Sequence, residues 1–145
     1  MTGIIVTGHG QFPSGILSAV TLVAGKPDNT AGVDFTDGQS SADLKEAMTK
    51  AMNTLDGDDI LILADLVGGT PFNTAAAIKA ERTDKKIKVI AGANMAALVE
   101  AVFSRPMYDL DGLAEAAFSA GESGIVDLDH LGEAPEEAPE FEDGL

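Results

Sequence analysis

Short apolar runs that alternate with helix-like segments constrain the fold of this chain more than any other feature of its sequence. Residues 4–6 and 60–64 are continuously apolar, and a glycine or an aspartate follows each run closely. Short runs without alternating polar residues are typical of strands that are covered on both faces. Residues 31–35 and 87–91 predict two further strands, the second ended by a glycine.

Helical patterns fill the segments between and after these strands. Ser40 and Asp43 have the spacing of a capping box before one helix, and Pro71 suits the first turn of another. Residues 14–24 are apolar around most of their circumference, which predicts a buried helix. Helices are predicted at residues 14–24, 44–55, 72–81, 94–103 and 110–120, with Asn94 as a cap. The order predicts an α/β fold, an open doubly wound and mostly parallel sheet with helices on both faces.

The C-terminal part of the chain differs from the rest. Residues 124–128 form a further candidate strand of undetermined direction. From residue 132 the sequence is acidic, contains two prolines and has no basic residue, so it cannot bury enough apolar area to offset the cost of ordering it. With 145 residues, the chain has room for one domain of ordinary size. We therefore expect one domain over residues 1–131 and a mobile tail over residues 132–145.

Charge and composition exclude several classes of function. The formal net charge of −15 repels nucleic-acid backbones and anionic lipid surfaces, and it favours partners with a basic patch. The absence of cysteine excludes disulfides and thiolate metal sites and fits a reducing compartment. No apolar stretch reaches the roughly 18 residues that a spanning helix needs. We expect a soluble, cytoplasmic protein that binds no nucleic acid and does not insert into membranes.

His9 follows the first predicted strand between two glycines, which places it at the strand's carboxyl end. In open α/β sheets this edge is where ligands bind. A neutral imidazole is also a nucleophile near pH 7. A turn residue or a capped surface group is the simpler interpretation if nothing else in the chain supports a catalytic one.

A second loop supplies that support. Asp65 ends the strand at residues 60–64, and Gly68, Gly69 and Thr70 lead from it into a predicted helix. If the two loops meet at the switch point, Asp65 can accept the Nδ1–H of His9 and leave Nε2 free to attack. Glycine N–H groups at a helix N-terminus suit a phosphoryl group. The simpler interpretation of this loop alone is a tight strand-to-helix connection with a satisfied aspartate.

Other motifs and titratable residues give less support for a function. The sequence has no Walker-type phosphate loop, no Gly-x-Ser-x-Gly elbow and no histidine pair at metal-ligand spacing, which disfavours an ATP-driven kinase, a lipase-type hydrolase and a zinc enzyme. His130 borders the tail and is predicted to be solvated. Arg82 and Arg105 are predicted to close helices, where the helix dipole favours cations.

At these loops the chain resembles the IIA domain of the mannose family of the bacterial phosphoenolpyruvate-dependent sugar phosphotransferase system. The resemblance rests on three segments, which are residues 8–10 with Gly15, residues 65–73 and residues 92–94. Pro13 and the segment 94–98 depart from the family pattern near the rim that would face a partner. These departures concern the identity of the partners more than the chemistry.

The resemblance implies a phosphoryl carrier. His9 would accept the phosphoryl group from the phosphocarrier HPr and pass it to a histidine of a IIB component, with membrane IIC and IID components downstream. Asp65 would bond the ring, with Gly68, Gly69 and Thr70 near the phosphate and no metal or cofactor. Family members are homodimers that exchange their last strand, which would account for residues 124–128.

Two alternatives stay open at this point. The phosphotransfer subunit of dihydroxyacetone kinase has a similar fold and an early histidine, although residues 68–73 argue against it. A flavodoxin-like module that binds a phosphorylated ligand reversibly would use His9 only as a hydrogen-bond donor. Covalent modification distinguishes this module from a carrier.

Overall fold

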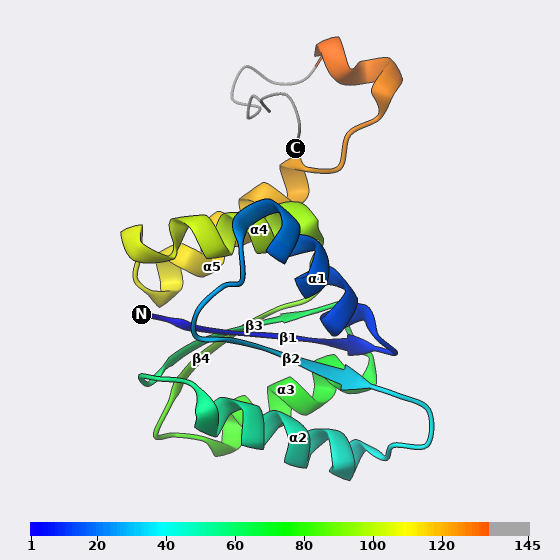
Figure 1. The fold of residues 1–145 in the computed structure, drawn as a ribbon. Helices are drawn as coiled ribbons and strands as arrows, with labels where there is room; N and C mark the ends of the chain where they lie inside the picture. Colours follow the sequence, from blue (N-terminus) through cyan, green and yellow to red (C-terminus); the bar gives the residue numbers. More distant parts are fainter. Residues whose placement is uncertain (134–145) are drawn as a thin grey trace.

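The computed structural model describes residues 1–133, and its centre is a parallel sheet of four strands (Figure 1). The strand order is β2-β1-β3-β4, so the two strands predicted from continuously apolar runs are the inner pair. This topology confirms the predicted α/β class and the parallel sheet. The strands are β1 (Gly3–His9), β2 (Thr30–Phe35), β3 (Asp59–Ala64) and β4 (Lys86–Ile90).

Helices cover both faces of this sheet, as the sequence predicts (Figure 1). One face carries α2 (Ser41–Thr54) and α3 (Thr70–Glu81). The other face carries α1 (Phe12–Ala24), α4 (Met95–Ser104) and α5 (Leu110–Ser123). Two short 3₁₀ helices complete the described chain, η1 (Arg105–Met107) and η2 (Leu128–Glu133).

The central strands divide their side chains between two cores. Ile4 and Val6 of β1 pack into the core under α1, α4 and α5, whereas Ile5 packs into the core above α2 and α3. The same alternation holds in β3, where Leu61 and Ile62 face opposite sides. Both faces are therefore apolar, which explains the absence of polar residues from these runs.

Local signals in the sequence set the helix ends. Ser40 and Asp43 form the predicted capping box at α2, with reciprocal hydrogen bonds of 3.1 and 3.0 Å. The predicted cap of α4 is confirmed, because Asn94 Oδ1 accepts the Ala97 N–H at 3.0 Å. Asn94 also donates to the Gly121 carbonyl at 2.9 Å, which joins α4 to α5.

Helix α1 is less buried than its apolar sequence predicts. Only Pro13 and Val20 of this helix are buried, and Leu22 is 90% exposed. The helix contacts β1, β2 and α4 along one side, and its other side faces solvent. The apolar composition of residues 14–24 therefore overestimates how much of this helix is buried.

The strand predicted at residues 124–128 is wrong for the single chain. Helix α5 continues to Ser123, residues 125–127 have no regular structure, and η2 follows. A strand needs hydrogen bonds to a neighbouring edge, and within residues 1–133 this segment pairs with neither β2 nor β4. Its exchange between two copies stays a prediction. Residues 132 and 133 of the predicted tail lie in η2, and the remainder lies outside the described residues.

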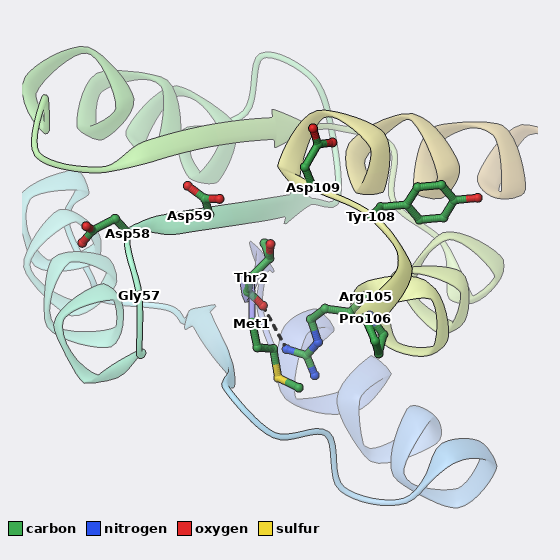
Figure 2. Close-up of a pocket in the computed structure, with 9 residues that line it drawn as sticks. All are labelled: Met1, Thr2, Gly57, Asp58, Asp59, Arg105, Pro106, Tyr108 and Asp109. Atoms are coloured by element: carbon green, nitrogen blue, oxygen red, sulfur yellow. Dashed lines mark hydrogen bonds between the residues drawn. The ribbon is translucent and has the colours of Figure 1, made fainter.

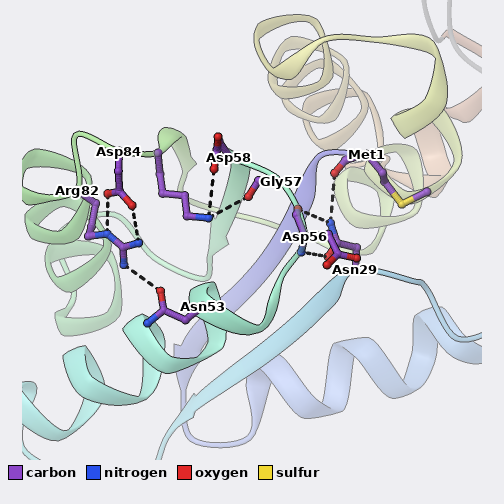
Figure 3. A network of polar contacts seen from close by, with 9 residues as sticks. Met1, Asn29, Asn53, Asp56, Gly57, Asp58, Arg82 and Asp84 are labelled. Atoms are coloured by element: carbon purple, nitrogen blue, oxygen red, sulfur yellow. Dashed lines mark hydrogen bonds and ion pairs between the residues drawn. The ribbon is translucent and has the colours of Figure 1, made fainter.

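Arg105 ties elements together at the amino-terminal ends of the strands. It was predicted only as a cation at a helix end, but the residue is buried, with 5% of its surface exposed, and its Nη1 donates to the carbonyls of Thr2 and Asn29 at 3.2 Å. It lines a hollow of about 610 Å³ at this edge (Figure 2). Nearby, the Asn29 side chain donates a hydrogen bond to the Met1 carbonyl and accepts one from the Asp56 N–H (Figure 3). This edge is the one opposite His9.

Candidate functional site

The predicted site residues meet at the carboxyl edge of the sheet. Strands β1 and β3 are neighbours, but α1 leaves β1 toward one face and α3 leaves β3 toward the other (Figure 1). This divergence is the switch point at which open α/β sheets bind ligands. His9 is the last residue of β1, and Asp65 directly follows β3.

His9 and Asp65 are joined by two hydrogen bonds. Oδ2 of Asp65 lies 2.9 Å from Nδ1 of the His9 ring and also accepts the His9 backbone N–H at 2.9 Å. The second carboxylate oxygen accepts the N–H of Leu66 at 2.8 Å. One carboxylate thus holds both the ring and the backbone of His9, and the ring contact is the one predicted from the sequence.

The carboxylate is ionised at neutral pH. Burial alone raises the pKa of Asp65, but the hydrogen bonds from the backbone and ring of His9 and from Leu66 bring this pKa below its ordinary value of 3.8. An ionised carboxylate only accepts hydrogen bonds, so Nδ1 is the protonated ring nitrogen in this pair. In a neutral ring, Nε2 then carries the lone pair.

The His9 ring is accessible to solvent, whereas the Asp65 side chain is mostly buried. The His9 side chain is 46% exposed, compared with 13% for Asp65. Phe35 of β2 borders the ring edge-on, with ring centroids 6.2 Å apart. The contact between Phe35 and His9 was not predicted from the sequence. The pairing of His9 with Phe35 in register along β1 and β2 accounts for it.

The loop before α3 approaches the free side of the His9 ring. A Cβ at Gly69 would lie 2.8 Å from Cε1 and 3.4 Å from Nε2, so a side chain would not fit without a shift. Gly68 has a φ of +78°, a conformation that favours glycine. The Asn73 side chain donates to the Gly68 carbonyl at 3.1 Å and holds the loop.

The N-terminus of α3 is open. Its N-cap residue is Gly69, and within residues 1–133 no side chain caps it. Pro71 has no N–H, so the first turn offers the N–H groups of Thr70 and Phe72, together with the Thr70 hydroxyl. Unpaired N–H groups and the helix dipole favour an anion at this end.

The weaker candidates lie elsewhere. His130 is exposed in η2, with Nε2 3.9 Å from Asp127. Arg82 ends α3 and pairs with Asp84 at 2.9 Å, and these contacts lower the pKa of Asp84 to about 2. Among residues 1–133, no group of histidines and carboxylates has the arrangement of a metal site.

Comparison with known proteins decides the family. Residues 3–118 match the family described as the PTS system fructose IIA component, EIIA-man. The chain belongs to this family. As a PTS EIIA component it is part of a sugar phosphotransferase system and acts in phosphoryl transfer. None of its helices within residues 1–133 is long and apolar enough to span a membrane.

Two relatives show how far the likeness extends. The EIIA component is 32% identical to the fructose-specific EIIA component of Bacillus subtilis over 106 residues, which are 72% of this chain and 71% of that protein. It is also 32% identical to the mannose-specific EIIAB component of Escherichia coli K12 over 133 residues, which are 88% of this chain. The chain spans only 40% of that longer protein.

Solved structures of EIIA proteins share the fold. The phosphotransferase system component EIIA from Streptococcus agalactiae has 43% identity and a TM-score of 0.86, with 90% of this chain and all of that chain covered. The mannose/sorbose-specific IIA subunit from Enterococcus faecalis has 25% identity and a TM-score of 0.79, covering 97% and 98% of the two chains.

Proposed function

We propose that this EIIA component carries a phosphoryl group on Nε2 of His9. The observation that carries the proposal is the pairing of His9 Nδ1 with Asp65 at 2.9 Å, which leaves Nε2 as the free ring nitrogen beside the α3 N-terminus. The donor is HPr and the acceptor is a histidine of a IIB component. The mannose- and fructose-specific names of the relatives support a role in a sugar phosphotransferase system. Membrane IIC and IID components downstream are part of this proposal.

The transfer exchanges one phosphorus–nitrogen bond for another. The Nε2 lone pair of His9 attacks the phosphorus, the bond to the donor imidazole breaks, and its electron pair returns to that ring. The Nδ1 proton stays on His9, and the ionised Asp65 stabilises the positive charge that the ring gains. Attack by the IIB histidine reverses these steps. Because the two bonds are chemically alike, positioning and preorganised donors lower the barrier.

Residues at the start of α3 and in the loop before it neutralise the negative charge of the phosphoryl group during transfer. Gly69 allows the backbone to approach the ring, and Gly68 shapes the turn before it. Thr70 offers both its N–H and its hydroxyl at the uncapped helix end. Phosphate charge is thereby balanced by backbone dipoles, which needs neither a metal nor a cofactor.

The net charge of the chain and the exposed residues beside the site indicate what kind of partner it binds. The formal net charge of −15 favours carriers with basic surfaces around their phosphorylated residues. Beside the site, Leu66 and Val67 are 59% and 77% exposed, so a partner can contact them.

We expect the chain to act as a homodimer, with the exposed residues Ile125 and Leu128 in the interface.

Intact mass after incubation with phosphoenolpyruvate, Enzyme I and HPr tests this function. The wild type is expected to gain one phosphoryl group that brief acid treatment removes, and His9→Ala is expected to gain none. His130→Ala is the matched control and should be modified like the wild type. An unmodified wild type with active donor proteins would favour reversible binding of a phosphorylated ligand instead.

A further inference from the structure

Helix α1, which follows His9, has no cap from its own segment. Its N-cap residue Gln11 makes no side-chain cap hydrogen bond, and Pro13 in the first turn has no N–H. Ser14, the third residue of the helix, donates its backbone N–H instead to Oδ1 of Asp34 at 2.9 Å. The Ser14 hydroxyl donates to Oδ2 of the same carboxylate at 2.8 Å. Asp34 of β2 therefore caps α1 from 20 residues away.

The turn that carries His9 is short and held from two sides. Only Gly10 and Gln11 separate His9 from α1, and Gly10 has a φ of +57°. The Gly10 N–H donates to the Phe35 carbonyl at 2.7 Å, one residue beyond Asp34. Strand β2 thus fixes both ends of the connection, while Asp65 fixes the imidazole from the side of β3.

We propose that Asp34 is a positioning residue for phosphoryl transfer, acting through Ser14 and the His9 turn. This inference rests on the proposed function of His9. Hydrogen bonds to a carboxylate are stronger than those to a neutral acceptor, so Asp34 sets where α1 begins relative to β2. The start of α1 in turn limits where Gly10 and His9 can lie. In-line attack by Nε2 tolerates little displacement, because errors of about 1 Å can cost about 100-fold in rate.

Asp34 also distinguishes the two helix N-termini at this edge of the sheet. Its negative charge compensates the N-terminus of α1, whereas the N-terminus of α3 has no side-chain cap. An anion therefore gains from contact with α3 and is repelled by the carboxylate at α1.

Steady-state kinetics with phospho-HPr as the varied substrate tests the role of Asp34. The matched control is Asp37→Asn, which removes the same charge from an exposed residue nearby. Asp34→Ala is expected to lower kcat at least about tenfold with KM for phospho-HPr within about twofold, because Asp34 acts on the His9 turn. Asp34→Asn, which keeps an acceptor oxygen, should recover most of kcat, and Ser14→Ala should fall between them. Wild-type kcat in Asp34→Ala, or an equal loss in Asp37→Asn, would overturn the inference.

Nitrogen NMR of the His9 ring separates this inference from the function on which it rests. In the wild type we expect a protonated Nδ1 and an unprotonated Nε2, and in Asp34→Ala a mixture of tautomers or broadened signals. His9 signals unchanged in Asp34→Ala would refute the positioning role even if the wild type accepted no phosphoryl group. If Asp34→Ala fails to fold, Ser14→Ala, which removes the hydroxyl hydrogen bond to Asp34, carries both measurements.

Discussion

At the scale of single residues, one carboxylate holds His9 in place. Asp65 binds the backbone and the ring of His9 through Oδ2 and the next backbone N–H through Oδ1. It therefore selects the ring tautomer and the ring orientation together. Its side chain is 13% exposed, compared with 46% for His9.

Removal of this carboxylate should slow transfer without unfolding the protein. In Asp65→Ala we expect phosphorylation by phospho-HPr to slow by about 100-fold or more, because the reactive tautomer is no longer favoured. Asp65→Asn retains an acceptor oxygen and should lose less. Rapid-quench measurement of the phosphorylated fraction checks both variants, with circular dichroism as the folding control. Wild-type rates in Asp65→Ala would remove Asp65 from the mechanism.

At the scale of elements, the important feature of α3 is that no side chain of residues 1–133 caps its N-terminus. Gly69 supplies an N-cap without a side chain, and its backbone borders the His9 ring. A helix end that must receive an anion from outside cannot have its N–H groups occupied by its own cap.

Gly69→Ala should abolish or strongly reduce phosphorylation. The new Cβ would lie 2.8 Å from Cε1 of His9 and would displace either the ring or the loop. Gly15→Ala is the matched control, because a Cβ there meets nothing within 4 Å and alanine favours the helix. We expect Gly15→Ala to be phosphorylated at the wild-type rate with equal or higher thermal stability. Full activity in Gly69→Ala would contradict the close approach.

The elements also show where sequence reasoning succeeds. The inner strands, the capping box of Ser40 and the cap of Asn94 depend on local patterns, and all were predicted. Residues 124–128 have a strand-like composition, but within residues 1–133 they pair with neither edge strand, β2 or β4. Arg105 and Asp34 act on residues far away in the sequence, so no local pattern reveals their partners.

At the scale of the whole molecule, the candidate site lies at one edge of the sheet and exposed apolar residues lie in the C-terminal segment. Ile125 and Leu128 are each 80% exposed, and they precede or begin η2. Monomeric proteins seldom expose large contiguous apolar surfaces, which favours a covering partner. A second copy of the chain is the partner that the family resemblance implies.

Sedimentation equilibrium at micromolar concentration tests this assembly. The wild type is expected at twice the chain mass, and the double variant Ile125→Asp, Leu128→Asp at the monomer mass, because buried unpaired carboxylates oppose association. Leu22→Asp on α1 is the control and should remain dimeric. A monomeric wild type would contradict the dimer, and dissociation by Leu22→Asp alone would place the interface elsewhere.

The identity of the phosphorylated nitrogen distinguishes the proposed mechanism from its alternatives. Phosphorus and nitrogen NMR of the phosphoprotein, with ring nitrogens labelled, distinguishes the two phosphohistidine isomers. The proposed mechanism predicts a single Nε2-phosphohistidine at His9, with Nδ1 still protonated and hydrogen-bonded to Asp65. A phosphoryl group on Nδ1 would contradict it, because that nitrogen lies 2.9 Å from the carboxylate that is proposed to hold it.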